Sequence, residues 1–321
     1  MSLKVHSTSP QVAVVMPSFN AAETILDSIA SVQQQSIADW EMIIVDDGST
    51  DETVALVKQV CSQDSRVRII QQVNSGPSIA RNRGVSEAQA PVVAFLDSDD
   101  LWESLHLELN LAALSKCSEL GVSFSPCRLM DADGKLTGER TAAWLDDVDI
   151  ADILSCNPSS TCSALVVQKS AFEDTQGFDK QMVHAEDQEW LYRVLTSGWK
   201  MRGISGATVR YRLSPKGLSA DTKRMHQGWQ AFIASAQKHT PEAVTRHLPK
   251  AQASMNLYFA RRLLRDGSTS SSMRQHLWAS LRSYPRIAFD QPKTIAVLFL
   301  SLLLPASIID QLLKLRGVQH A

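Results

Sequence analysis

The chain has 321 residues, a length that suggests two domains or one large domain with an extension. Its apolar fraction of 44% and charged fraction of 21% are those of a globular protein, so extensive disorder, collagen and coiled-coil rods are excluded. The net charge of −2 at pH 7 argues against nucleic acid as a partner, because nucleic-acid-binding domains carry an excess of basic residues.

The charge is unevenly divided along the chain. Residues 1–215 contain 17 Lys and Arg against 29 Asp and Glu, a net charge of −12, whereas residues 216–321 contain 15 against 5, a net charge of +10. We therefore predict three parts: a polar N-terminal arm over 1–10, a globular domain over 11–215 and a basic, mostly helical region over 216–321.

The N-terminal arm and the cysteines predict a cytoplasmic protein. The arm has no apolar stretch, so we expect no secretory signal peptide. The five cysteines are odd in number and include no CxxC pair, which favours reduced thiols that fill the core.

Four apolar segments in the first hundred residues predict buried strands that alternate with helices. The predicted strands cover 12–16, 40–45, 67–73 and 91–96. Asn20 and Glu23 have the spacing of a capping box at the start of the first helix. The strand ends recur about every 25 residues, as in consecutive βα units of a parallel sheet, so we predict an α/β fold.

The pattern is looser after residue 100. It predicts helices over 102–117 and 186–197, strands over 122–129 and 163–168, and mostly helix over 222–289 with a break at Gly267. The segment 295–309 is the most apolar of the chain.

Acidic residues follow two of the predicted strands. Asp46 and Asp47 end the second, and Asp97, Asp99 and Asp100 end the fourth. Such residues also terminate strands and cap helices, but two acidic clusters on one sheet edge repel each other unless a cation binds there. A divalent cation that bridges a diphosphate prefers such oxygen ligands, so we predict a metal–diphosphate site.

Four segments together resemble the family 2 inverting glycosyltransferases: VVMPSFN, VDDGSTDET, SGPSIARNRG and FLDSDD, in this order and spacing. A later segment, QMVHAEDQEWLYRVLTSGWK, is similar to the ED motif of that family. The resemblance covers about 11–215. It implies the GT-A fold, a mainly parallel α/β sheet flanked by helices, a nucleotide-diphosphate sugar as donor, and Mn²⁺ or Mg²⁺ as cofactor.

The resemblance also implies roles for single residues on the donor side. Asp47, with Asp46, reads the edge of the nucleobase, and Pro17 and Asn20 help to form that pocket. A carboxylate can accept the imide N–H of uracil or thymine, so UDP- and dTDP-sugars are favoured. Arg81 lies close to the nucleotide, where its guanidinium can donate to phosphate or ribose oxygens; the alternative is a surface arginine on a solvated helix.

Asp97 and Asp99 resemble the DxD pair of the family, which holds the ribose and the metal-bound diphosphate, with Asp99 the better metal-ligand candidate. Asp100 is a candidate cap for the following helix. By the same resemblance Asp187 is the general base and Glu186 supports it, although acids at a helix start also serve as caps. Structural roles are the preferred interpretation for His184, Trp190, Trp199 and Asp51.

The sequence departs from the family at three points. Gln176-Gly177 replaces a doubled glycine, and no histidine follows Tyr211-Arg212, so the third metal ligand is open. The QxxRW motif of processive members is absent, so we expect transfer of one sugar per encounter.

The apolar segment 295–309 is too short to span a bilayer, which takes about 20 residues. It is either a buried helical hairpin or an interfacial anchor whose basic neighbours face anionic lipid, and the charge of +10 favours the membrane surface. The prediction is thus a glycosyltransferase acting on a glycan or lipid-linked acceptor, at the inner face of the plasma membrane.

Three other functions fit the sequence less well. A sugar nucleotidyltransferase needs a glycine-rich, basic loop after the first strand, which SFNAAET does not provide. A non-catalytic, membrane-tethered binding module would lack one of the key acids, and Asp97, Asp99 and Asp187 are all present. A phosphoaspartate receiver domain is shorter and needs a lysine that cannot be identified here.

Overall fold

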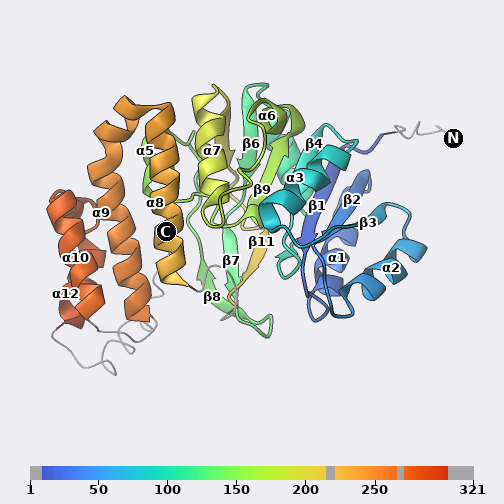
Figure 1. Ribbon diagram of the computed structural model, residues 1–321, viewed down its shortest axis with the longest axis horizontal. Coiled ribbons are helices and arrows are strands. Elements are labelled where there is room, and N and C mark those ends of the chain that lie inside the picture. The colour runs from blue at the N-terminus through green and yellow to red at the C-terminus, as the bar shows by residue number, and fades with distance from the viewer. Residues whose placement is uncertain (1–8, 215–220, 266–270, 303–321) are drawn as a thin grey trace.

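The computed structural model describes residues 9–214, 221–265 and 271–302 (Figure 1). Its large sheet has seven strands in the order β10-β6-β9-β4-β1-β2-β3. Their bounds are Val12–Ser18 (β1), Trp40–Asp46 (β2), Val67–Gln71 (β3), Val92–Phe95 (β4), Leu120–Phe124 (β6), Leu165–Gln168 (β9) and Lys200–Gly203 (β10). Only β9 runs antiparallel to its neighbours in this sheet, which confirms the mainly parallel α/β architecture.

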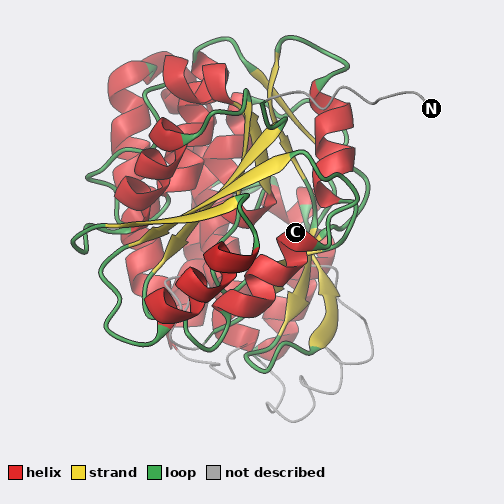
Figure 2. Cartoon of the chain, turned by 90° about the vertical axis from the view of Figure 1, so that its right-hand side faces the viewer, coloured by secondary structure: helices red, strands yellow, loops and turns green. Residues whose placement is uncertain are grey.

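Helices cover both faces of the twisted sheet (Figure 2). They are α1 (Ile25–Gln33), α2 (Thr53–Gln63), α3 (Pro77–Glu87), α4 (His106–Leu114), α6 (Lys169–Asp174) and α7 (Glu186–Thr196). α1 buries Ile25, Ile29 and Val32, which recur at helical spacing. α3 lies directly on β1 because Gly84 has no side chain: a Cβ there would meet Cγ1 of Val15 at 2.3 Å.

A second, small sheet adjoins the first. Its strands are β5 (Leu101–Trp102), β11 (Val209–Arg212), β7 (Cys127–Met130) and β8 (Leu136–Arg140), in that order. Two predictions were wrong here. The helix expected over 102–117 begins only at His106, because Trp102 pairs with Val209. The single strand expected over 122–129 is two strands, β6 and β7, one in each sheet.

Several short elements were not predicted: β8, β10, β11, α5 (Ile150–Ser155), α6 and a 3₁₀ turn at Cys162–Ala164. The five cysteines are all free thiols, as expected from their number.

The C-terminal region is helical, as predicted. It contains α8 (Thr222–His239), α9 (Pro241–Arg265), α10 (Ser271–Ser283), α11 (Ile287–Asp290) and α12 (Pro292–Ser301), stacked beyond α7 at the end of the molecule away from β3 (Figure 1). Trp229 and Phe232 of α8 belong to the core of the α/β part, whereas a separate apolar cluster begins at Ala253 in α9. The domain boundary at residue 215 stays a prediction, as does the N-terminal arm, of which 1–8 lie outside the described residues.

The apolar segment 295–309 is described only to residue 302, and Gly267 also lies outside the described residues. Ile295 and Leu298 of α12 are buried in the cluster that α9 and α10 form, not against the strands. Among the described residues no helix is both long and apolar enough to cross a membrane.

Candidate active site

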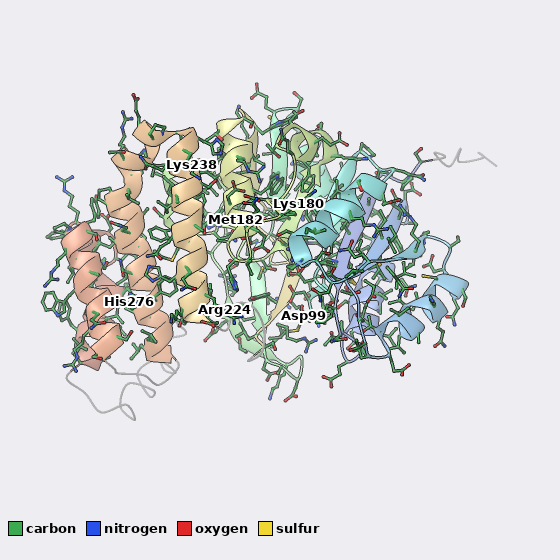
Figure 3. The ribbon with its side chains drawn as sticks, viewed as in Figure 1. Asp99, Lys180, Met182, Arg224, Lys238 and His276 are labelled. Atoms are coloured by element: carbon green, nitrogen blue, oxygen red, sulfur yellow. The ribbon has the colours of Figure 1, made fainter. Side chains whose placement is uncertain are left out.

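Both acidic clusters lie at one edge of the large sheet, as predicted. Asp46 ends β2 in register with Ser18 at the end of β1, and Asp97 follows β4, which pairs with the other side of β1. Figure 3 labels Asp99 at this lower edge, below Met182 of the loop that leads into α7. Because β1, β2 and β4 are parallel, their carboxyl ends meet where ligands bind in open α/β sheets.

Asp47 is bound on both carboxylate oxygens by the protein itself. Oδ1 accepts hydrogen bonds from Nε2 of Gln72 and the backbone N–H of Ser75, and Oδ2 accepts one from the N–H of Gly76, each at 2.8 Å. These bonds hold the loop that leads into α3. Asp47 therefore shapes the edge of the site, a role that the sequence analysis did not foresee.

Asp46 keeps an acceptor atom unused. Its side chain is buried, with the residue only 1% exposed, and its Oδ2 accepts from the backbone N–H of Ser49 at 3.3 Å. Its Oδ1 is buried and has no hydrogen-bond partner. An unsatisfied buried oxygen costs free energy unless a ligand or a water donates to it. Of the two aspartates, Asp46 has the free acceptor that an imide N–H requires.

Asn20 joins the first and second strand-end loops. Its backbone has a φ of 49°, its Oδ1 accepts from the N–H of Thr50 at 2.8 Å, and its N–H donates to Oγ of Ser49 at 2.9 Å. The capping-box prediction was wrong, because α1 begins at Ile25 after Thr24. Pro17 is buried in β1, and it lies within the sheet edge that supports Asn20.

Asp51, by contrast, acts at a helix start, as expected. Its Oδ1 accepts from the backbone N–H and the hydroxyl of Thr53, the first residue of α2, at 3.0 and 2.5 Å.

Arg81 is buried at the centre of the site. Its side chain is 6% exposed, so the alternative of a solvated surface arginine was wrong. One guanidinium nitrogen donates to Oδ1 of Asp97 at 2.6 Å, and the other donates to Oε1 of Glu186 at 3.0 Å. The arginine therefore joins two acids that lie far apart in sequence, one on each side of the site.

The turn after β4 contains three aspartates with different surroundings. Burial, together with the charge of Asp97, raises the pKa of Asp99 to about 6. Asp100 is fully buried, and its Oδ1 accepts from the backbone N–H of Arg212 at 2.8 Å. The expected helix-capping role of Asp100 was wrong, because this bond ties the turn to β11 of the small sheet.

Arg212 fixes the same turn from β11. Its Nε donates to the backbone oxygen of Asp99 at 2.8 Å, and one terminal nitrogen donates to the oxygen of Ala132 at 2.8 Å. Arg212 thus places a positive charge beside Asp99, and no histidine directly follows it in the sequence.

Glu186 and Asp187 open α7. Glu186 faces the site, where it accepts from Arg81, and Asp187 also accepts from the backbone N–H of Gln188 in the first turn of its own helix at 2.7 Å. The residue before them, Ala185, has a φ of 60° and makes no side-chain cap. Burial, with the charge of Asp187, raises the pKa of Glu186 to about 7. Burial also raises the pKa of Asp187. A carboxylate whose pKa is raised toward neutrality is a better proton acceptor.

Asn157 is a site residue that the sequence analysis missed. Its Nδ2 donates to Oδ2 of Asp187 at 2.6 Å, while its Oδ1 accepts from the N–H and the hydroxyl of Ser159 at 3.1 and 2.8 Å. The amide is thereby locked with its donor toward Asp187. No spacing in the sequence links residues that are 30 positions apart, so only the fold could reveal this contact.

We expect Asn157→Ala to lower kcat for transfer about 10–100-fold with little change in the KM for the donor, because Asp187 loses the group that orients it. The acidic limb of the pH profile should move upward, since the amide stabilises the charged carboxylate. Steady-state kinetics across pH check both. Ser159→Ala removes only one of the two bonds that hold the amide and leaves the bond to Asp187, so it should lower kcat less than Asn157→Ala does. An unmoved pH profile in Asn157→Ala would contradict the role.

The donor set at Asp97 and Asp99 fits a hard divalent cation. Both offer carboxylate oxygens, and burial beside the like charge of Asp97 raises the pKa of Asp99, so a bound cation would favour its charged form. Within the described ranges no group of three or more His, Cys, Asp and Glu is arranged to hold a metal. Two protein carboxylates with diphosphate oxygens and water are a usual coordination for Mg²⁺.

The remaining residues take the structural roles that were expected. Trp190 is fully buried and its Nε1 donates to Oγ1 of Thr175 at 2.9 Å. Trp199 donates to Oδ2 of Asp174 at 3.1 Å. His184 lies against α8, where a Cβ on Gly228 would approach its Cβ at 2.5 Å, so the glycine permits this contact.

The chain is similar to known glycosyltransferases. The family model of glycosyl transferase family 2 matches residues 13–125. The putative teichuronic acid biosynthesis glycosyltransferase TuaG of Bacillus subtilis is 44% identical over 240 residues, which are 73% of this chain and 92% of that protein. The Escherichia coli enzyme WfgD, a UDP-Glc:alpha-D-GlcNAc-diphosphoundecaprenol beta-1,3-glucosyltransferase, is 28% identical over 224 residues, 69% of this chain and 85% of that protein.

Solved structures show the same fold. TarS 1–349 of S. aureus in complex with UDP-GlcNAc has a TM-score of 0.60 at 16% identity, covering 91% of this chain and 87% of TarS 1–349. The mannosyltransferase PcManGT of Pyrobaculum calidifontis, with GDP-Man and Mn²⁺, has a TM-score of 0.62 at 18% identity, covering 95% and 88%. Since the family motifs lie together at one sheet edge and TuaG aligns over nearly its whole length, this chain belongs to glycosyl transferase family 2 and is a glycosyltransferase of the GT-A fold.

Proposed function

We propose that the chain is a metal-dependent, inverting enzyme that moves one sugar from a nucleotide-diphosphate sugar to a hydroxyl of a glycan or lipid-linked acceptor. The observation that carries this proposal is the double ion pair of Arg81, which joins Asp97 at the strand ends to Glu186 beside Asp187. The acids expected to hold the donor and the acids expected to accept the proton thereby share one site.

The donor end of the site suits a pyrimidine nucleotide. Asp46 offers its unpaired Oδ1 to the imide N–H of uracil or thymine, while Asp47, Asn20 and Pro17 hold the surrounding loops. UDP- and dTDP-sugars are therefore the favoured donors. The structural neighbour TarS 1–349 was solved in complex with UDP-GlcNAc, which supports this choice.

Asp99, with Asp97, would hold Mn²⁺ or Mg²⁺ together with the diphosphate. When bound, such a cation neutralises the negative charge that develops on the leaving diphosphate. Mn²⁺ in the related fold of PcManGT supports the same use here. Arg81 holds Asp97 in place, and Arg212 fixes the backbone of Asp99.

Asp187 acts as the base on the acceptor side. It takes the proton of the acceptor hydroxyl as that oxygen forms a bond to the anomeric carbon, and the bond to the diphosphate breaks with its electron pair leaving on the nucleotide. A single displacement of this kind inverts the anomeric configuration. Glu186, held by Arg81, supports the charge balance around the base.

We expect Asp99→Asn to weaken metal-dependent binding of UDP about 10–100-fold or more. Loss of a residue that only hydrogen-bonds to a metal ligand already has an effect of about that size. Calorimetric titration of UDP in Mn²⁺ and in EDTA checks this, and Mn²⁺ binding alone can be followed by electron paramagnetic resonance. The exposed Asp133→Asn is the matched control. UDP binding that is as strong in EDTA, or in Asp99→Asn, as in the wild type with Mn²⁺ would remove the metal from the proposal.

The acceptor is proposed from the relatives. TuaG is named for teichuronic acid biosynthesis and WfgD for a diphosphoundecaprenol acceptor, so we place this chain in cell-envelope or exopolysaccharide synthesis, with a glycan or lipid-linked acceptor. The absence of a QxxRW motif favours transfer of one sugar per encounter. A lipid-linked acceptor and the basic C-terminal region both favour work at the inner face of the plasma membrane.

A further inference from the structure

The last helices, α10 to α12, carry exposed apolar and basic side chains, and Trp278 of α10 meets Phe299 of α12. We call this exposed set the α10–α12 face, and its members are Arg274, Trp278, Arg282, Phe289, Lys293 and Leu300. We propose that this face docks the enzyme on an anionic lipid surface. The inference deepens the proposed function, on which it rests for the location of the enzyme, and it assigns the contact to particular residues.

Three large apolar side chains of this face are open to solvent. Trp278 is 50% exposed, Phe289 85% and Leu300 47%. The ring of Trp278 meets the edge of Phe299 with 5.9 Å between centroids, so the tryptophan links α10 to α12 while half of it stays exposed. Exposed Trp and Phe beside basic residues are typical of helices that lie in the headgroup region of a bilayer.

The charges on and around the face are mainly basic. Arg274, Trp278 and Arg282 recur every four residues and so share one side of α10. Within 271–302 all charged side chains are exposed, and four of the five are basic; Asp290 is the exception. None of the four basic side chains forms an ion pair with another described residue, so the positive charge is available to an anionic partner.

The face is built on a packed support. Met273, Leu277, Ile295 and Leu298 are buried beneath it, in the cluster that α9, α10 and α12 form. The inward sides of α10 and α12 therefore supply the folding energy, and the outward Trp, Phe and Leu are not needed for that core. The exposed side chains of the face are thus separate from the buried side chains that form the core of these helices.

The position of the face suits attachment. Figure 1 shows α10 and α12 at one end of the molecule, and α9, α8 and α7 follow in that order toward the large sheet. α7 begins with Glu186 and Asp187, so a continuous stack of helices links the face to the site. Binding through the α10–α12 face leaves the strand ends at another side of the molecule.

The test is co-sedimentation of the full chain with vesicles of phosphatidylcholine alone and of phosphatidylcholine with phosphatidylglycerol. Each basic residue near an anionic surface contributes about fivefold in partitioning, so Arg274→Gln with Arg282→Gln should lower binding to the anionic vesicles about 30-fold. Phe289→Ser should lower binding about tenfold through lost apolar insertion. The matched control is Lys58→Gln with Lys116→Gln, two exposed lysines of the α/β part, which should bind as the wild type.

Several results would overturn the proposal. The proposal would be wrong if the wild type bound vesicles equally well without phosphatidylglycerol, or if the lysine control lost as much binding as the arginine variant. It would also be wrong if the chain bound vesicles only after residues 303–321 had been removed. A dimer by light scattering that Phe289→Ser dissociates would assign the face to a second copy instead. Donor turnover in solution should be unchanged in the face variants. Absence of vesicle binding in a wild type that turns over its donor normally would contradict this inference alone. Vesicle binding without donor turnover would contradict only the proposed function.

Discussion

Asp187→Asn is expected to lower the rate of sugar transfer about 10²–10⁴-fold while the affinity for the nucleotide sugar is largely retained. A base acts in the chemical step, when the acceptor hydroxyl loses its proton, and it contributes little to binding of the donor. The amide can still accept a hydrogen bond but cannot take the proton. Single-turnover transfer and calorimetric titration of the donor, made on the same preparation, separate the two quantities.

The companion variants decide which acid of the pair is the base. Glu186→Gln should lose less activity than Asp187→Asn, because Glu186 is tied to Arg81. Asp27→Asn, on the exposed side of α1, should behave as the wild type. If Asp187→Asn transfers sugar at the wild-type rate while Glu186→Gln is inactive, the roles within the pair are reversed.

Arg81→Met is expected to lower the free energy of unfolding by about 3–5 kcal/mol, because it leaves two carboxylates without their common cation in a buried site. Arg81 is 6% exposed and contacts both Asp97 and Glu186, so solvent cannot replace it. Urea denaturation in EDTA measures the change. The matched control is Arg224→Met, whose exposed pair with Asp221 should cost only about 0–1 kcal/mol.

The destabilisation should depend on pH in a definite direction. The pKa of Glu186 is already raised to about 7, and loss of Arg81 should raise it further. The unfolded chain has a glutamate pKa of about 4.3, below that of Glu186 in the folded state. The stability that Glu186 contributes is therefore fully present below pH of about 4.3, and it is lost as the pH rises through the pKa of the folded state. Below the wild-type pKa of Glu186 both proteins lose this stability in parallel, so the deficit of Arg81→Met should grow as the pH rises from about 7 to about 8. A deficit that shrinks over this range would contradict the ion-pair account.

The regular part of the fold could be predicted from sequence because its signals are local. The four strands and three helices of the first hundred residues follow from apolar runs and helical spacing, as with Ile25, Ile29 and Val32 of α1. The second sheet could not be predicted, because Trp102 and Val209 pair across more than a hundred residues. Its short strands carry no clear alternation of their own, so the chain around 102 and 122–129 was assigned wrongly.

The site shows the same division between local and distant information. The acids at the strand ends are visible as motifs, and their meeting at one edge follows from the parallel strand order. Which partner each acid has is a property of the fold. The bonds of Asp47 to the loop before α3, of Arg81 to Glu186, and of Asn157 to Asp187 join segments 28 to 105 residues apart.

The central claim is that this site releases a nucleoside diphosphate from a nucleotide sugar with the help of a divalent cation and Asp187. The most direct measurement is nucleoside diphosphate release from a panel of UDP- and dTDP-sugars, in Mn²⁺ and in EDTA, with the wild type and Asp187→Asn. We predict release from at least one of these donors in Mn²⁺, and none above background in EDTA. With a sugar acceptor present, Asp187→Asn should be about 10²–10⁴-fold slower. Release from no donor in the panel, or release that is equal in EDTA, would contradict the account.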